Sequence, residues 1–271
     1  MNVAVVGHTE WVEFARVERV PAAGDIVHAL ETWEEAAGGG AVAAVQLAHL
    51  AGSVRFFTAL GSDELGRRTR AQLTEQGVTV HAATPSAAHR RALTYLDGDG
   101  ERTITVFGDK LLPGGGDGSL PWEELARADA VYFVSGDVEA LRQARKARIL
   151  VAGARELPTL ARAGVEIDVL VGSGEDETER YRPGDLDPAP KIVVTTAGAL
   201  GGWVQPGGPF TAAPLPGPIE DAYGCGDCFA GGLTYALAEG KPLDEGVALG
   251  ARCGAYVLCG RGPYGNQLTV A

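Results

Sequence analysis

Residues 221–232 read Asp221-Ala-Tyr-Gly-Cys-Gly-Asp-Cys-Phe-Ala-Gly-Gly232, a glycine turn followed by an acid and an apolar helical run that ends at Gly240. The backbone N–H groups at a helix start are unpaired and lie at the positive end of the helix dipole, so this turn is a candidate anion site. Asp227, placed there, can accept a proton from a hydroxyl that attacks a phosphoryl group. The same residues, taken alone, fit an ordinary capping turn equally well.

The composition of the 271 residues fits one α/β domain. Apolar residues make up 45% of the chain and charged residues 21%, which argues against global disorder. The net charge of −12 argues against a nucleic-acid partner. The first residues lack the basic segment of a signal peptide, and no stretch approaches the roughly 18 apolar residues of a membrane span. We therefore expect no membrane partner and a cytoplasmic location.

Four cysteines raise the alternative of a metal or redox site. Cys225 and Cys228 form a CxxC pair, but five residues separate Cys253 from Cys259, and no histidine lies near either pair. This spacing differs from regular zinc patterns, and a cysteine in an apolar helical run, such as Cys253, usually acts as a small hydrophobe. A zinc or redox protein therefore ranks below the alternatives that follow.

Short apolar runs alternate with helical runs along most of the chain. The expected buried strands cover residues 2–7, 54–60, 78–81, 130–135, 149–152, 169–171 and 191–196. The expected helices cover residues 41–50, 66–76, 139–146, 157–163 and 229–239. This alternation predicts a mainly parallel sheet covered on both faces, with ligands bound beyond the carboxyl ends of its strands.

Two segments depart from the alternation. Residues 91–96 and 102–107 flank Asp97-Gly-Asp-Gly and predict an antiparallel hairpin, and residues 10–20 read as a further exposed strand. We interpret these strands as a small sheet set apart from the main domain, and a lid is its natural role. A second hairpin is expected at residues 201–204 and 210–213.

Together these segments resemble the ribokinase-like (PfkB-type) carbohydrate kinases. Residues 221–232 are similar to the signature D-T-x-G-A-G-D-x-F, with Ala222 for Thr and Cys225 for Ala. Four further segments match in the same order, namely Gly38-Gly39-Gly40, residues 57–66, residues 97–104 and residues 193–201. The resemblance spans residues 2–265. It implies one α/β domain over residues 1–271, a ribokinase-like three-layer α/β/α sandwich with lid strands at about 10–20 and 90–107.

The resemblance also implies a reaction, the transfer of the γ-phosphoryl group of ATP, with Mg²⁺, to a hydroxyl of a sugar-like small molecule. Asp227 would be the general base, and the amides of Gly224, Cys225 and Gly226 would form the anion hole. The residues near the nucleotide would be Thr196, Gly198 and Gly201. Asp221 and the backbone of Arg261 and Gly262 would lie near a loop that binds a monovalent cation such as K⁺.

The expected acceptor site departs from the family pattern. Gly38, Gly39 and Gly40 can bring backbone close to a ligand, but Val12 stands where the family has an Asp, and Val42 or a neighbouring Ala where it has an Asn. Glu10 shares the face of Val12 in an extended strand and is the better substitute for that Asp. On the lid, Arg90 or Arg91 can meet an anionic group of the substrate. The magnesium motif N-x-x-E appears as Ser173-Gly-Glu-Asp176, which keeps oxygen ligands.

Three readings stay open at this point. The first is an active sugar kinase, with a nucleoside kinase as the variant that the sequence does not exclude. The second is a ligand-binding or regulatory member of the same fold with weak catalysis, which the missing Asp and Asn favour. The third is the zinc or redox protein. In each kinase reading the exposed edges of the lid strands favour a homodimer formed through the lid.

Overall fold

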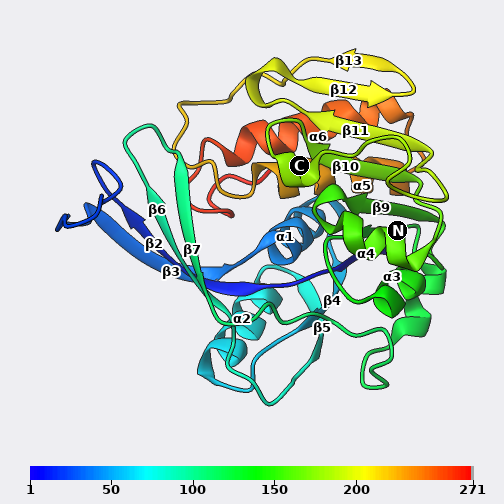
Figure 1. The fold of residues 1–271 in the computed structure, drawn as a ribbon, viewed down its shortest axis with the longest axis horizontal. Coiled ribbons are helices and arrows are strands. Elements are labelled where there is room, and N and C mark those ends of the chain that lie inside the picture. Colours follow the sequence, from blue (N-terminus) through cyan, green and yellow to red (C-terminus); the bar gives the residue numbers. More distant parts are fainter. Residues whose placement is uncertain (270–271) are drawn as a thin grey trace.

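The computed structural model describes residues 1–269, which form a nine-stranded sheet between two helical layers and a separate four-stranded lid sheet (Figure 1). Seven neighbouring strands of the large sheet run parallel, and two antiparallel strands extend one edge. In spatial order the strands are β13 (Gly208–Phe210), β12 (Gly202–Gln205), β11 (Ile192–Thr196), β10 (Val169–Ser173), β9 (Ile149–Gly153), β8 (Ala130–Phe133), β1 (Val3–Val6), β4 (Val54–Ala59) and β5 (Val78–Ala83).

Helices cover both faces of this sheet because successive side chains of each strand point to opposite sides. Val3 and Val5 of β1 belong to one apolar core and Ala4 and Val6 to another. The first core includes side chains of α1 (Gly39–Ala51), α2 (Glu64–Glu75), α5 (Cys225–Ala238) and α6 (Leu243–Val257). The second includes side chains of η1 (Trp122–Arg127), α3 (Val138–Ala144) and α4 (Leu157–Ala163). The predicted three-layer sandwich is thus confirmed.

The lid lies to one side of this body and consists of β3 (Glu31–Ala37), β2 (Glu10–Arg16), β6 (Arg91–Leu96) and β7 (Arg102–Phe107), in that order (Figure 1). The strand expected at residues 10–20 ends at Arg16, and β3 was not expected at all. Its sequence is rich in glutamate and alanine, which are depleted in strands, so pairing with β2 rather than propensity holds it extended. The second hairpin is tighter than expected, since β13 begins at Gly208.

The path of the chain places the lid beside the carboxyl ends of the parallel strands. β1 ends at Val6, and β2 of the lid begins only four residues later, at Glu10. The carboxyl ends of β8, β9, β10 and β11 lie along the same edge, because all four run parallel to β1. Any site at this edge is therefore flanked by the lid. No helix within residues 1–269 has the length and apolar character to cross a membrane.

Candidate functional site

The glycine turn of residues 224–226 forms the N-terminus of α5, one turn earlier than the sequence suggested. Gly224 is the N-cap in the left-handed region at φ +83°, and a Cβ there would lie 2.8 Å from Val42 Cγ1. The first helical hydrogen bond runs from Cys228 N to Gly224 O at 2.9 Å, so the preceding amides have no partner within the helix. A Cβ on Gly226 would meet no protein atom within 4 Å. The turn therefore has amides without a partner in the helix and open space beside Gly226, as an anion site requires.

Asp227 is the third residue of α5 and faces the start of α1. Its Oδ1 atom lies 2.7 Å from the position that a Cβ of Gly39 would occupy. The pKa of Asp227 is raised from 3.8 to about 6, mainly by burial; the charges of Glu179 and Glu10 also raise it, and those of Arg102 and Arg155 oppose the shift. A carboxylate with this pKa is ionised at neutral pH and remains a better proton acceptor than an ordinary aspartate. This is the property that a general base needs.

Polar side chains follow neighbouring strands along the edge beside Asp227. His8 follows β1 and contacts Ser135, which follows β8; its backbone N donates to Ser135 Oγ at 3.0 Å, and its Nδ1 lies 2.9 Å from the same oxygen. Arg155 follows β9, Ser173 ends β10 and Thr196 ends β11. The spatial order of the strands therefore arranges these five residues in a row.

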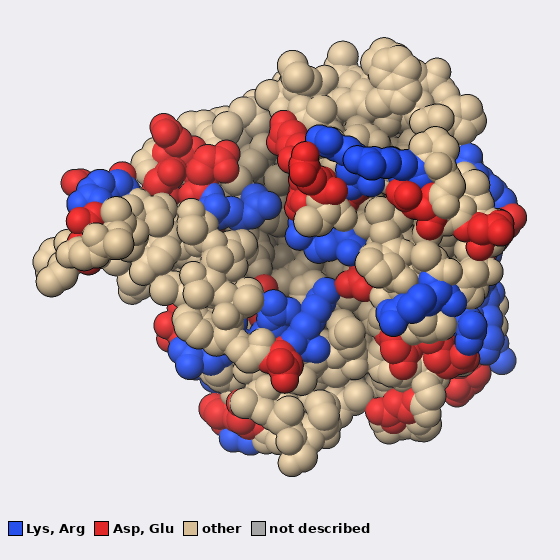
Figure 2. Space-filling view, in the orientation of Figure 1, with Lys and Arg blue, Asp and Glu red and all other residues tan. Residues whose placement is uncertain are grey.

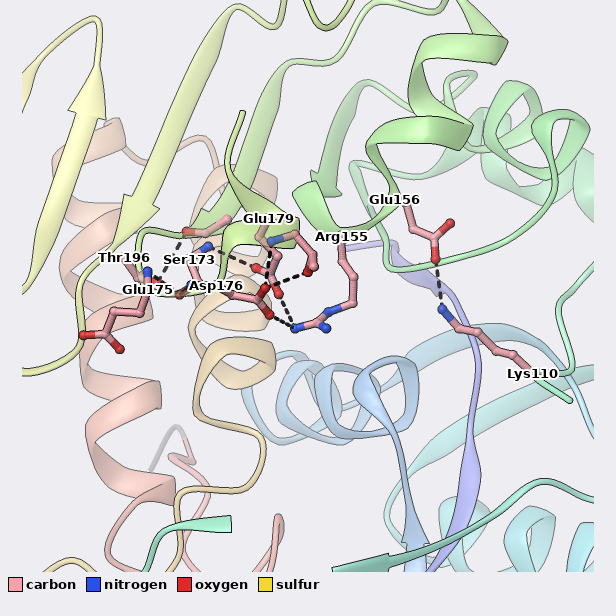
Figure 3. Close-up of polar contacts among 10 residues, drawn as sticks. Lys110, Arg155, Glu156, Ser173, Glu175, Asp176, Glu179 and Thr196 are labelled. Carbon is pink, nitrogen blue, oxygen red and sulfur yellow. Dashed lines mark hydrogen bonds and ion pairs between the residues drawn. The ribbon is translucent and has the colours of Figure 1, made fainter. Parts of the chain in front are cut away.

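A cluster of acids surrounds Arg155 (Figure 3). Its guanidinium pairs with Asp176 at 2.8 Å and with Glu179, and Glu179 also accepts a hydrogen bond from Ser173 N at 3.0 Å. Ser173 Oγ accepts from the backbone N–H groups of Glu175 and Asp176. The side chain of Glu175 points away from the cluster (Figure 3). Sequence reasoning singled out Ser173 and Asp176 but not Glu179, which ends the acidic run of residues 175–179 and lies three residues after Asp176.

The turn after β11 lies on the side of the cluster away from β1. Thr196 O accepts from Gly174 N at 2.8 Å, which ties the end of β11 to the loop after β10. Gly198 and Gly201 both have positive φ, at +50° and +88°, and a Cβ on Gly201 would clash with the Phe210 carbonyl. The glycine pattern thus forms a tight turn beside the acidic cluster.

Asp221 lies in a buried loop, where its two oxygens accept hydrogen bonds from Tyr223 N at 2.8 Å and Gly262 N at 3.0 Å. Burial raises the pKa of its carboxyl. The side chain of Arg261 points instead to the lid, where it pairs with Glu31 at 2.7 Å and stacks over Trp33. The structure therefore brings together Asp221 and the backbone at Gly262, and only the backbone of Arg261 belongs to this loop.

Three glycines at the start of α1 allow the helix to approach β1 and Asp227. Gly38 has φ +86°, and its N donates to Tyr223 Oη at 3.1 Å. A Cβ on Gly40 would lie 2.5 Å from His8 O. The positive φ favours glycine at Gly38, the Asp227 side chain leaves no room for a Cβ at Gly39, and the backbone at the end of β1 leaves none at Gly40.

The other residues expected at the acceptor site lie differently. Val12 and Val42 are fully buried in the apolar core, and Val42 packs beside Gly224. Arg91 pairs with Glu13, and both side chains are about half exposed. Its neighbour Arg90 pairs with Glu10 at 3.2 Å, and both of these side chains are nearly buried. The structure therefore places Arg90, and not Arg91, toward the site.

Two further cations near the site were missed in the sequence. Arg102 of β7 donates to Ala222 O at 2.6 Å, just before the glycine turn. Lys110 follows β7 and pairs with Glu156 at 2.9 Å (Figure 3). Lys and Arg side chains line the hollow between the lid and the main body (Figure 2). No local sequence signal distinguishes these cations from other surface charges, because their position depends on how the lid sits on the body.

The cysteine pair belongs to the turn as a structural element. Cys228 is buried and accepts a weak hydrogen bond from Gln267 Nε2 at 3.4 Å. Burial raises the pKa of both Cys225 and Cys228. Metal binding and disulfide exchange need the thiolate, which this burial disfavours. The amide of Cys225, rather than its thiol, is then the group available for chemistry.

A half-buried carboxylate beside helix-terminal amides, at the carboxyl edge of a parallel sheet and next to a lid, is the arrangement expected of a phosphotransferase with a ribokinase-like fold. Residues 1–154 and 166–269 match the pfkB family carbohydrate kinases, and the chain belongs to this family. Members of this family are phosphotransferases that act on hydroxyl groups. This protein is therefore a phosphotransferase of the same kind.

Individual relatives agree with this assignment. The chain is 27% identical over 276 residues to an ATP-dependent ribose-1-phosphate kinase of Halopiger xanaduensis, covering 94% of this chain and 91% of that protein. It is 24% identical over 268 residues to a 5-dehydro-2-deoxygluconokinase of Photobacterium profundum, covering 82% and 80%. The crystal structure of a ribokinase from Thermotoga maritima superposes with a TM-score of 0.80 at 20% identity, covering 99% and 96%, which shows the shared fold.

Proposed function

We propose that this protein transfers the γ-phosphoryl group of ATP to a hydroxyl of a sugar or sugar-like small molecule. The observation that carries the proposal is the position of Asp227, against Gly39 and directly after the unpaired amides of residues 224–226. A hydroxyl beside Asp227 would also lie near a phosphoryl group bound by those amides. The relatives named above include kinases of phosphorylated and acidic sugars, which supports a sugar-like acceptor.

In this reaction Asp227 accepts the hydroxyl proton while the acceptor oxygen bonds to the γ-phosphorus and the bond to ADP breaks. The amides of Gly224, Cys225 and Gly226 donate to the oxygens of the transferring group, where negative charge must be stabilised. A hydroxyl held between base and phosphoryl group reacts mainly because it is positioned. The intact base and turn favour this reading over a binding protein with weak catalysis.

The nucleotide would lie on the β10–β11 side, near Thr196, Gly198 and Gly201. Within residues 1–269 no group of three or more His, Cys, Asp or Glu side chains could hold a metal ion directly. Asp176 and Glu179 nevertheless place carboxylate oxygens together around Arg155, and oxygen ligands acting through water suit magnesium. These two residues, with Ser173, would hold the Mg²⁺ that accompanies ATP, and the ion would offset phosphate charge.

A monovalent cation such as K⁺ would fit beside Asp221. This carboxylate is fully buried and, within residues 1–269, has two backbone N–H donors, with Arg16 and Arg102 acting on it from a distance. A cation in the adjoining loop would compensate its charge and would fix the segment that leads into residues 224–226. We also propose that two copies pair through the lid, since all six residues of the edge strand β7 are exposed and include Ile104, Val106 and Phe107.

The proposal is tested by measuring ADP formation with a panel of sugars, sugar acids, sugar phosphates and nucleosides, for the wild type and Asp227→Asn. We expect turnover of at least one sugar-like acceptor and its loss in the variant. Turnover unaffected by the substitution would remove Asp227 as the base. Turnover of nucleosides alone would assign the protein to the nucleoside kinases, and binding without turnover of any compound would identify a binding protein.

A further inference from the structure

The half of the hollow on the β1 side of Asp227 is distinct from the nucleotide half and contains three groups that the proposed mechanism does not use: His8, Arg90 and Lys110. A Cβ on Gly38 would lie 3.2 Å from Glu10 Cγ, whereas one on Gly39 would contact Asp227. Glu10 in turn pairs with Arg90. Because Gly38 and Gly39 are adjacent, Glu10 and its partner Arg90 lie next to the candidate base Asp227. The charges of Lys110, Arg90 and Arg155 all lower the pKa of His8, so these three cations lie within electrostatic range of its ring.

Each of the three groups keeps hydrogen-bond donors free. Arg90 Nε lies 3.2 Å from Glu10 Oε2, but within residues 1–269 the Arg90 guanidinium makes no hydrogen bond of good geometry. Its side chain is 15% exposed, so it is held in place and still reachable. Lys110 Nζ donates to Glu156, and an ammonium has two further hydrogens to donate.

His8 offers a donor as well. Ser135 is fully buried, and its Oγ accepts from His8 N, so its own hydrogen needs an acceptor. His8 Nδ1, at 2.9 Å, is the acceptor within reach. The imidazole hydrogen must then be on Nε2, because burial and the surrounding cations lower the pKa of His8 and keep it neutral.

Two acceptors that the family pattern provides for a neutral sugar are replaced by apolar residues in this half. Val12 and Val42 occupy the places where the family resemblance puts an Asp and an Asn, and both are fully buried. Glu10 Oε2 is also buried and lies against Arg90. A sugar hydroxyl both donates and accepts, whereas a phosphate or carboxylate only accepts. Arg and Lys bind such groups through charge-assisted hydrogen bonds, which are about twice as strong as neutral ones.

We propose that the acceptor of this kinase carries an anionic group, a phosphate or a carboxylate, which Arg90, Lys110 and His8 bind on the β1 side of Asp227. This inference rests on the proposed function. Glu10 and Glu156 hold Arg90 and Lys110 in position, so little side-chain freedom is lost on binding. The anionic group would thereby fix which hydroxyl of the acceptor reaches Asp227.

The test compares neutral sugars with their phosphates and with aldonic acids as acceptors, using ADP formation and, on the Asp227→Asn protein, calorimetric binding without turnover. We expect kcat/KM for one anionic acceptor to exceed that of its neutral parent by 100-fold or more. The phosphate and aldonic-acid series show which anion the site takes. Equal kcat/KM for the neutral parent would overturn the inference while leaving the kinase proposal intact. If the wild type turned over no acceptor although an anionic sugar bound to the protein, the kinase proposal would be contradicted instead.

Two variants assign the binding residues. Lys110→Met keeps most of the side chain, and the double variant Glu10→Gln/Arg90→Gln removes both members of the buried pair, so no buried charge is left unpaired. Each should raise KM for the anionic acceptor 10-fold or more and leave KM for ATP unchanged. Arg19→Gln, on an exposed lid arginine, is the matched control. If only Arg91→Gln raised KM for the anionic acceptor, the anion would bind on the outer face of the lid, and the assignment would be overturned.

Discussion

Arg102 Nη1 lies 2.6 Å from the carbonyl oxygen of Ala222, so a lid strand is hydrogen-bonded to the segment that leads into the anion-binding turn. A second bond reinforces this contact, from Ala222 N to Gly100 O at 3.0 Å. Arg102 is also the strongest charge that opposes the raised pKa of Asp227. The position of the lid therefore affects the acidity of the candidate base as well as access to it.

Opposite pH shifts are expected from two charge-removing variants. Arg102→Gln removes the charge that lowers the Asp227 pKa most, whereas Glu179→Gln removes one that raises it. The acidic limb of kcat/KM against pH, which reports the ionisation of the base, should move to higher pH in the first variant and to lower pH in the second. Identical profiles for both variants would show that the limb belongs to another group.

Asp227→Asn should lower kcat by roughly 10²- to 10⁴-fold, the usual contribution of a general base. It should also stabilise the protein above about pH 6, because the folded-state pKa is raised from 3.8 to about 6 and ionising the buried carboxyl disfavours folding. The gain should be absent below pH 3.8, grow between these two values and then level off at roughly 3 kcal/mol, since each pKa unit corresponds to about 1.4 kcal/mol. Urea unfolding of the variant and the wild type at several pH values measures this gain in the free energy of unfolding. A gain that falls as the pH rises would contradict the prediction.

Gly226→Ala separates stability from activity. A Cβ at this position meets no protein atom within 4 Å, so the fold should tolerate it, and replacing glycine by alanine in a helix stabilises by about 1 kcal/mol. The same methyl would occupy the space in front of the unpaired amides, where we place the transferring phosphoryl group. We expect an unchanged or higher Tm together with a fall in kcat of about 100-fold. Full activity in this variant would remove the turn from the mechanism.

The lid edge gives a prediction about assembly. Val106→Lys introduces a charge into the exposed apolar strand β7 and should convert a dimer into a monomer in sedimentation equilibrium. Leu215→Lys, on an exposed apolar residue outside the lid, is the matched control and should leave the assembly unchanged. A wild-type protein that sediments as a monomer would contradict the proposed homodimer.

Much of the architecture could be predicted from local patterns. The apolar strands alternate with helices whose ends are marked by glycine, and this pattern predicted the parallel sheet and its two helical layers. β3 was missed because its glutamates and alanines carry no strand signal, and only pairing with β2 makes it a strand. The acidic cluster around Arg155 was predicted only in part, since Glu179 lies beyond the matched segment and reaches Ser173 and Arg155 only because the chain turns back.

The sequence by itself determined the turn of residues 224–226 and the acid that follows it, because a positive φ at Gly224 and a helix start depend on neighbouring residues alone. Only the tertiary structure decided what surrounds Asp227. Arg90 and Arg91 are adjacent in the chain, and strand β6 pairs with β2 so that Arg91 lies opposite Trp11. In this register Arg91 pairs with Glu13 on the exposed face of the lid. Arg90 pairs with Glu10 on the buried face, toward the site. Side chains of a strand alternate between faces, so the register between strands distant in the sequence determines which charge enters the site.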